Sequence, residues 1–127
     1  MKLTFYGEPQ YLIDEEKGTV TCTLECGFTA ELLHTMRNYG FTYTGDLPPY
    51  WVVRGIARLH PDDTFDKTIG CRIAESKAKQ KAYKKGANLL SLIIKRFDRL
   101  STELVDTIHF LSEKESFELE HYNKLIV

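Results

Sequence analysis

Hydrophobic and polar residues alternate over residues 19–26, within a predicted hairpin from Gln10 to Phe28, with the period of two that is typical of β-strands. Every second residue from Val20 to Cys26 is apolar, and threonine or glutamate stands between these positions. A strand that buries one face shows this alternation, because successive side chains point to opposite faces. The segment Glu15–Gly18 comes before it and can form the turn, since Gly18 tolerates a positive φ. We therefore predict a β-hairpin.

A short helix and a third strand are expected next. Thr29 is placed to act as the N-cap of the helix, and Asn38-Tyr39-Gly40 is a stop signal. The third strand is predicted over Trp51–His60, where the alternation returns. Its two faces are expected to hold Val53, Ala57 and Leu59 on one side, and Arg54, Ile56, Arg58 and His60 on the other.

The dominant predicted element is a long helix over Asp66–Leu100, where apolar residues recur near helical spacing. We expect Asp62, Asp63 or Thr64 to cap its N-terminus. Asp66 would then add favourable negative charge to the first turn, because the positive end of the helix dipole lies there.

This helix is long for a chain of 127 residues. At 1.5 Å per residue it would extend about 52 Å, whereas a compact domain of this size has a radius of gyration of about 14 Å. It must therefore either protrude or bend, and Gly86 and Ser101 are the candidate break points. A separate C-terminal helix is predicted over Ser101–Leu125.

The predicted fold class is α+β, in the order ββαβαα, with the helices packed on a small antiparallel sheet. We expect a single domain over residues 1–127, with a sheet-rich part (1–65) and a helical part (66–127). The composition, 43% hydrophobic and 28% charged, is that of a globular protein. The densest apolar run, Leu89–Ile94, is far shorter than the roughly 20 residues of a membrane span. A cytoplasmic protein without membrane contact is expected.

The three cysteines are consistent with a reducing compartment. Cys22 and Cys26 lie on one face of the predicted strand about 13 Å apart, which is too far for a disulfide or a shared metal ion. Cys71 has no partner at CxxC spacing. We expect all three to be free and to serve as small buried apolar residues.

The net charge of −1 hides a strong asymmetry along the chain. Residues 1–50 hold 3 basic and 7 acidic side chains (−4), residues 51–100 hold 12 and 5 (+7), and residues 101–127 hold 2 and 6 (−4). A basic middle between acidic flanks points to an acidic partner for the middle segment.

The lysine-rich part of the long helix is the strongest functional signal. Its lysines recur at i, i+4, i+7 and i+8, which places them on one helical face. Like charges at this spacing slightly destabilise a helix, so a partner that binds them is favoured over a merely solvated face. Flexible ammonium groups suit phosphates or acidic protein surfaces. The predicted binding residues are Arg54, Arg58, Arg72, Lys77, Lys81, Lys84 and Lys85.

Catalysis and cofactor binding find little support in the sequence. The segment His60–Asp66 gathers one imidazole and three carboxylates, so a metal-dependent enzyme is an alternative. Capping and helix-dipole effects explain the same acids, however. No phosphate-binding glycine motif occurs, and the other histidines lack a catalytic partner. We expect no catalytic residue, no metal and no cofactor.

The C-terminal segment offers a second binding mode. Its apolar residues Leu104, Ile108 and Leu111 continue a near-heptad pattern and could form a homodimer seam. Its acidic surface could instead dock on a basic groove of a partner protein. It could also fold back on the lysine face of its own chain. These alternatives remain open from the sequence.

Two resemblances add to these expectations. The segment Arg54–Asp66 (RGIARLHPDDTFD), with Gly70 and the AESKA of residues 74–78, resembles a signature of small phage and prophage proteins of uncharacterised function. The resemblance covers about a third of the chain and implies a phage-type accessory protein, a class that includes inhibitors of host defence such as anti-CRISPR proteins. It implies no specific binding residue.

The second resemblance concerns the third strand and the SKAKQKA of residues 76–82. They are similar to the strand and lysine-rich second helix of double-stranded-RNA-binding domains, although the lysines here start about ten residues into the helix. We therefore expect a non-enzymatic accessory protein that binds nucleic acid or a nucleoprotein complex of the host. The alternative is a protein-only adaptor or inhibitor that docks by its acidic C-terminal helix.

Overall fold

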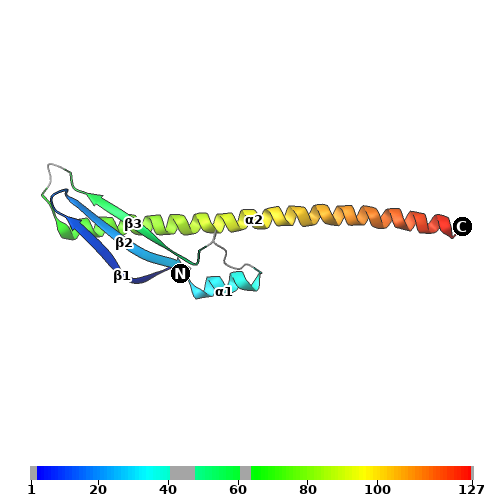
Figure 1. Ribbon diagram of the computed structural model, residues 1–127, viewed down its shortest axis with the longest axis horizontal. Coiled ribbons are helices and arrows are strands. Elements are labelled where there is room, and N and C mark those ends of the chain that lie inside the picture. Colours follow the sequence, from blue (N-terminus) through cyan, green and yellow to red (C-terminus); the bar gives the residue numbers. More distant parts are fainter. Residues whose placement is uncertain (1–2, 41–47, 61–63, 127) are drawn as a thin grey trace. The chain divides into compact units, whose positions relative to one another are not determined.

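The computed structural model describes residues 3–40, 48–60 and 64–126 (Figure 1). The predicted α+β class is confirmed, and the element order is β-β-α-β-α. The three strands form one antiparallel sheet in the order β1-β2-β3. The elements are β1 (Leu3–Asp14), β2 (Thr19–Phe28), α1 (Ala30–Asn38), β3 (Tyr50–Arg58) and α2 (Lys67–Leu125).

The predicted hairpin is present as β1 and β2, which pair up to Asp14 and Thr19 at the turn. Gly18 has φ of 63°, the left-handed conformation expected of it. The first strand begins at Leu3, earlier than the predicted start of the hairpin at Gln10. The pairing register shifts between Tyr6 and Gln10, and a strand with such a bulge loses its simple period of two.

The predicted cap and stop of the short helix are confirmed. Thr29 lies in extended conformation before α1, and its Oγ1 accepts a hydrogen bond from the Leu32 backbone N–H over 3.4 Å. The helix ends where the Gly40 N–H donates to the Arg37 carbonyl, with φ of 86° at Gly40.

The buried faces of β2 and β3 are those that the alternation predicted. Cys22 and Cys26 are fully buried, whereas Cys71 is only partly buried, so the expectation of three buried cysteines holds for two of them. All three are free thiols. The apolar side chains buried on the inner face of the two strands are Val20, Cys22, Leu24, Cys26, Phe28, Trp51, Val53 and Ala57.

The first part of α2 packs on this face through small residues spaced four apart. Ala74, Ala78 and Ala82 are completely buried. The series extends to Gly70 and Gly86, where a methyl group would lie within 3.5 Å of sheet side chains. Small residues at this spacing let the helix backbone approach the sheet closely. Gly86 is therefore a packing contact inside the continuous helix α2, and this candidate break point is not a break.

The start of α2 also differs from the prediction. Oδ1 of Asp66 accepts hydrogen bonds from the backbone N–H groups of Thr68 and Ile69, over 3.0 and 3.2 Å. Asp66 is thus the cap, because its carboxylate reaches the free amides of the first turn. Thr64 lies two residues earlier, outside the helix, and does not have the predicted role. The other two predicted caps lie outside the described residues.

The structure divides into two units, residues 1–89 and 90–127. α2 continues through Ser101 without interruption, so the predicted break and separate C-terminal helix are wrong. In the second unit every residue from Ile94 to Ile126 is exposed.

Candidate nucleic-acid interface

The lysine side of α2 runs along the outer edge of β3. In the described sheet β3 pairs with β2 alone, so its other edge carries backbone groups without a strand partner. Nζ of Lys77 donates a hydrogen bond to the Ile56 carbonyl over 3.2 Å. This contact places the lysine-bearing side of α2 directly beside the strand.

Two hollows follow this edge. The first has a volume of about 430 Å³ and is lined by Ile56, Arg58 and four helix residues from Lys77 to Lys84. The second, of about 590 Å³, lies against Val52–Arg54 and two helix lysines. Lys81 lines both, so the hollows adjoin. We call the cations that line them the basic surface, and they are Arg54, Arg58, Lys77, Lys81, Lys84 and Lys85.

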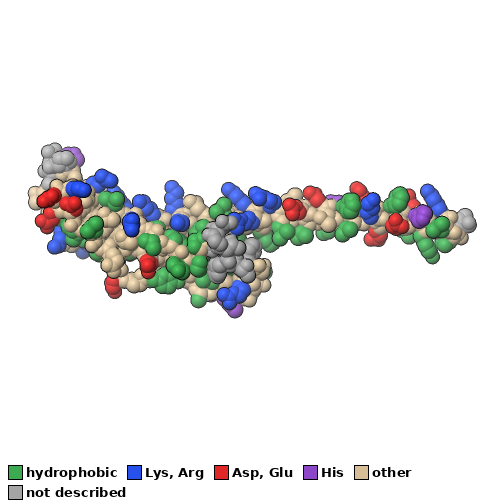
Figure 2. Space-filling model, viewed as in Figure 1, with side chains coloured by type: hydrophobic (Ala, Val, Ile, Leu, Met, Phe, Trp, Pro, Cys, Tyr) green, Lys and Arg blue, Asp and Glu red, His purple; other side chains and the backbone are tan. Residues whose placement is uncertain are grey.

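The local structure explains why these side chains meet. Val53, Gly55 and Ala57 face α2, so Arg54 and Arg58 start on the opposite face of β3 and reach the hollows around its edge. On α2 the lysines flank the buried alanine positions. Figure 2 shows lysine and arginine side chains recurring along the part of α2 that passes the sheet.

The basic surface has no internal acidic compensation among the described residues. All six of its side chains belong to exposed residues, and none forms an ion pair with a described carboxylate. Lys79, by contrast, lies on the β1 side of the helix and contacts Glu75 over 3.2 Å. The positive charge is therefore concentrated on one side of α2, where solvent and partners reach it.

Glu75 is the centre of a different arrangement on the β1 side. The Tyr11 hydroxyl donates to Glu75 Oε2 over 3.3 Å, and Lys79 lies above the Phe5 ring at 5.9 Å. Loss of solvation, followed by the negative charge of Glu75, raises the pKa of Tyr11 to about 12. Arg72 is one turn before Glu75 and lines neither hollow, so the structure does not unite it with the other predicted binding residues.

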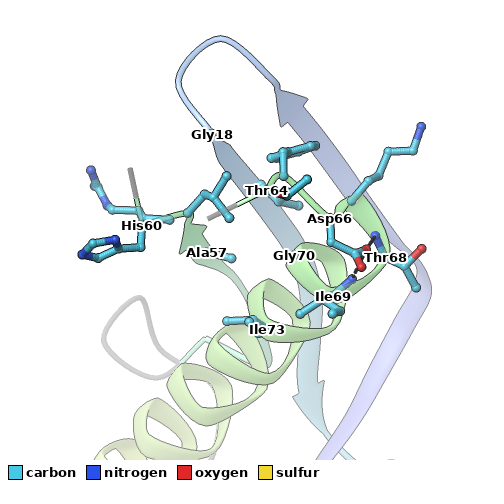
Figure 3. A pocket seen from close by; sticks show the side chains of 14 residues that line it. Gly18, Ala57, His60, Thr64, Asp66, Thr68, Ile69, Gly70 and Ile73 are labelled. Carbon is cyan, nitrogen blue, oxygen red and sulfur yellow. Dashed lines mark hydrogen bonds between the residues drawn. The ribbon is translucent and has the colours of Figure 1, made fainter. Parts of the chain in front are cut away.

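The predicted metal alternative falls on the N-terminal end of α2, beside a cavity of about 690 Å³ (Figure 3). Within the described part of the chain, no group of three or more His, Cys, Asp or Glu side chains is placed to hold a metal ion. Asp66 is engaged with the helix amides, and in Figure 3 the ring of His60 points away from it. Asp62 and Asp63 lie outside the described residues.

Sequence reasoning missed one residue that lines the first hollow and two cross-strand neighbours of the arginines. Gln80 lines the first hollow, and its spacing of three from Lys77 and four from Lys84 could have revealed it. Thr19 and Thr23 stand opposite Arg58 and Arg54 in the sheet. The pairing register identifies these threonines, and no local sequence pattern does.

The chain matches no protein-family model, no curated protein and no solved structure. Among the described helices, none is both long enough and apolar enough to cross a membrane.

Proposed function

We propose that this chain is a non-enzymatic binding protein that holds the phosphate backbone of a nucleic acid, free or within a nucleoprotein complex, on the basic surface. The observation that carries the proposal is the juxtaposition of six cations from β3 and α2 without an ion pair from the described residues. Gathering like charges is unfavourable for the isolated chain, and a polyanion would offset that cost.

The residue types favour backbone contacts over base recognition. Four of the six cations are lysines, whose flexible ammonium groups bind phosphate as point charges. The neighbouring Thr19 and Thr23 add hydroxyl donors, which also serve phosphate oxygens. Binding of this kind depends strongly on salt and weakly on sequence.

Protection of the β3 edge is the competing explanation. Charged side chains, lysine above all, often keep an edge strand from pairing with other molecules. Lys77 performs this role through its bond to Ile56. Protection of the strand edge at Ile56 needs only this one lysine. Further positive charge extends along the helix at Lys81, Lys84 and Lys85, which edge protection does not explain.

The phage-like signature supports a biological setting for this activity. We propose that the chain acts in the host cytoplasm as a phage-type accessory protein, with a nucleoprotein complex of host defence as its target. Such complexes expose phosphate groups, which are what the basic surface would bind. An anti-CRISPR inhibitor is one protein of this kind.

The test is binding of a fluorescently labelled duplex over a series of salt concentrations. If four to six phosphates are neutralised, the plot of log K against log salt should have a slope of about −3.5 to −5.5. Replacing Lys77, Lys81, Lys84 and Lys85 by glutamine should reduce affinity by at least tenfold and flatten the slope.

The matched control removes an equal number of positive charges outside the basic surface, with glutamine in place of Lys17, Arg37, Lys67 and Lys124. It should retain most of the affinity, because these residues lie outside both hollows. Equal losses in the two variants would show that net charge alone drives binding and would contradict a specific surface. Absence of binding by the folded wild-type chain to DNA and RNA duplexes would favour docking through the acidic helix.

A further inference from the structure

The second unit presents an apolar face that nothing in the described structure covers. Six large apolar side chains, each 51–60% exposed, follow one another at steps of three or four residues, with Glu115 between Leu111 and Leu119 and Glu118 at the edge of the same side of the helix. At about 100° per residue they fall within a sector of about 100° around the helix. Figure 2 shows hydrophobic side chains along one side of this segment. We call this set the apolar face: Leu100, Leu104, Ile108, Leu111, Leu119 and Tyr122.

A helix segment of this kind is unstable alone. Most helical stability in proteins comes from packing an amphipathic face, and residues Ile94–Ile126 bury none of theirs. The face extends over about 33 Å from Leu100 to Tyr122 at 1.5 Å per residue. A second helix of similar length and pattern would fit it.

We propose that the apolar face binds the same face of a second copy of this chain, with the two helices antiparallel. The argument for a second copy is the charge distribution. Residues 95–99 hold three basic and one acidic side chain (+2), and residues 113–120 hold one basic and four acidic (−3). Antiparallel pairing brings the basic segment of one copy to the acidic segment of the other, and it does so twice by symmetry.

Glu115 sets the orientation. It occupies the position on the apolar face between Leu111 and Leu119. In a parallel pair in register, Glu115 would meet Glu115 of the second copy inside an apolar interface, where two like charges are strongly unfavourable. In the antiparallel pair it lies beside Leu100, next to the basic residues 95–99 of the second copy.

The flanking charges agree with the same register. Glu103 and Lys114 are eleven residues apart, three helical turns, and so lie on the same flank of the apolar face. When Leu104 faces Leu111 of the second copy, Glu103 lies beside Lys114 of that copy. In a parallel pair, Glu103 and Lys114 would instead face the opposite flank of the second copy's helix. That flank carries Ser101, Val105 and Ser112 and offers no opposite charge.

The first experiment is sedimentation equilibrium of the full chain over a dilution series. The expected mass is twice the 14.7 kDa of one chain at high concentration. Replacing Leu104 and Leu111 by aspartate should convert the protein to monomer. The matched control places aspartate at Phe110 and Phe117, also exposed and seven residues apart but outside the face, and should remain dimeric. A wild-type chain that stays monomeric throughout would overturn the proposal.

The second experiment tests the orientation by charge exchange. Glu103→Lys and Lys114→Glu should each raise the dimer dissociation constant several-fold, and the double variant should return it to the wild-type value. Asp106→Lys, which changes the charge equally on the outer side of the helix, should have little effect. Additive weakening in the double variant would refute the antiparallel register. No nucleic-acid measurement enters either experiment, so the outcome is independent of the basic surface.

Discussion

Gly55 of β3 lies directly beneath Ala78 of α2. A methyl group at Gly55 would be 3.0 Å from the Ala78 Cα and would overlap the backbone nitrogen of Ala78 and the carbonyl oxygen of Ala74. The absence of a side chain therefore sets the spacing between helix and sheet. Lys77 and Lys81 flank Ala78 on the helix, so the same contact positions the basic surface beside β3.

Gly55→Ala should destabilise the protein by about 1–3 kcal/mol, because the overlap is with backbone atoms that cannot rotate away. Gly86→Ala is the contrasting variant. Its methyl group would meet Leu3 Cδ1 at 3.1 Å, a flexible side-chain end, while alanine favours the helix by about 1 kcal/mol over glycine. Urea unfolding should show a clear loss of unfolding free energy for Gly55→Ala and no comparable loss for Gly86→Ala.

Asp66→Ala should cost about 1 kcal/mol of stability, because the Thr68 and Ile69 amides lose their acceptor. Asp66→Asn should retain most of the stability, since an amide oxygen can also cap a helix. Thermal unfolding of both variants, with Thr64→Ala as the control outside the helix, measures these effects. If Thr64→Ala lost as much stability as Asp66→Ala, the assignment of Asp66 as the cap would be contradicted.

Tyr11 should titrate late. Its pKa is raised from 10.0 to about 12, first by loss of solvation and second by the Glu75 carboxylate. The folded state thus holds the phenol proton more tightly than the unfolded state. The resulting stabilisation is complete below pH 10 and is lost as the pH rises to about 12.

The stability advantage of the wild type over Tyr11→Phe should accordingly shrink across that interval. Tyrosinate absorbance, compared between these two proteins, locates the Tyr11 titration directly. Glu75→Gln should lower the pKa, because the negative charge beside the hydroxyl is gone. A Tyr11 that titrates near pH 10 would contradict the Tyr11–Glu75 contact.

Cys71 should be the reactive thiol of the native chain. Cys22 and Cys26 are completely buried, and burial is the first cause of their raised thiol pKa values. Both effects slow reaction with a disulfide reagent at neutral pH, because the thiolate is the reactive form. We expect one fast thiol per folded chain and its loss in Cys71→Ser. Three equally fast thiols would indicate an open sheet–helix packing.

The sequence by itself determined the local elements that depend on nearest neighbours. The alternation in β2 and β3 predicted their buried faces, because side chains of a strand must alternate between core and solvent. Thr29 and Gly18 predicted a cap and a turn for equally local reasons. The lysine face of α2 was visible too, since helical spacing depends on sequence separation alone.

Only the tertiary structure decided how these elements combine. Gly86 reads as a helix breaker along the chain, yet packing against Leu3 and Trp51 gives it a place within α2. Arg72 shares the basic segment but lines neither hollow, whereas Arg54 and Arg58 reach the lysines around the edge of β3. The direction in which α2 crosses the sheet decides which cations lie together. The close approach of α2 to Gly55 helps to fix that direction, and it involves residues far apart in the sequence.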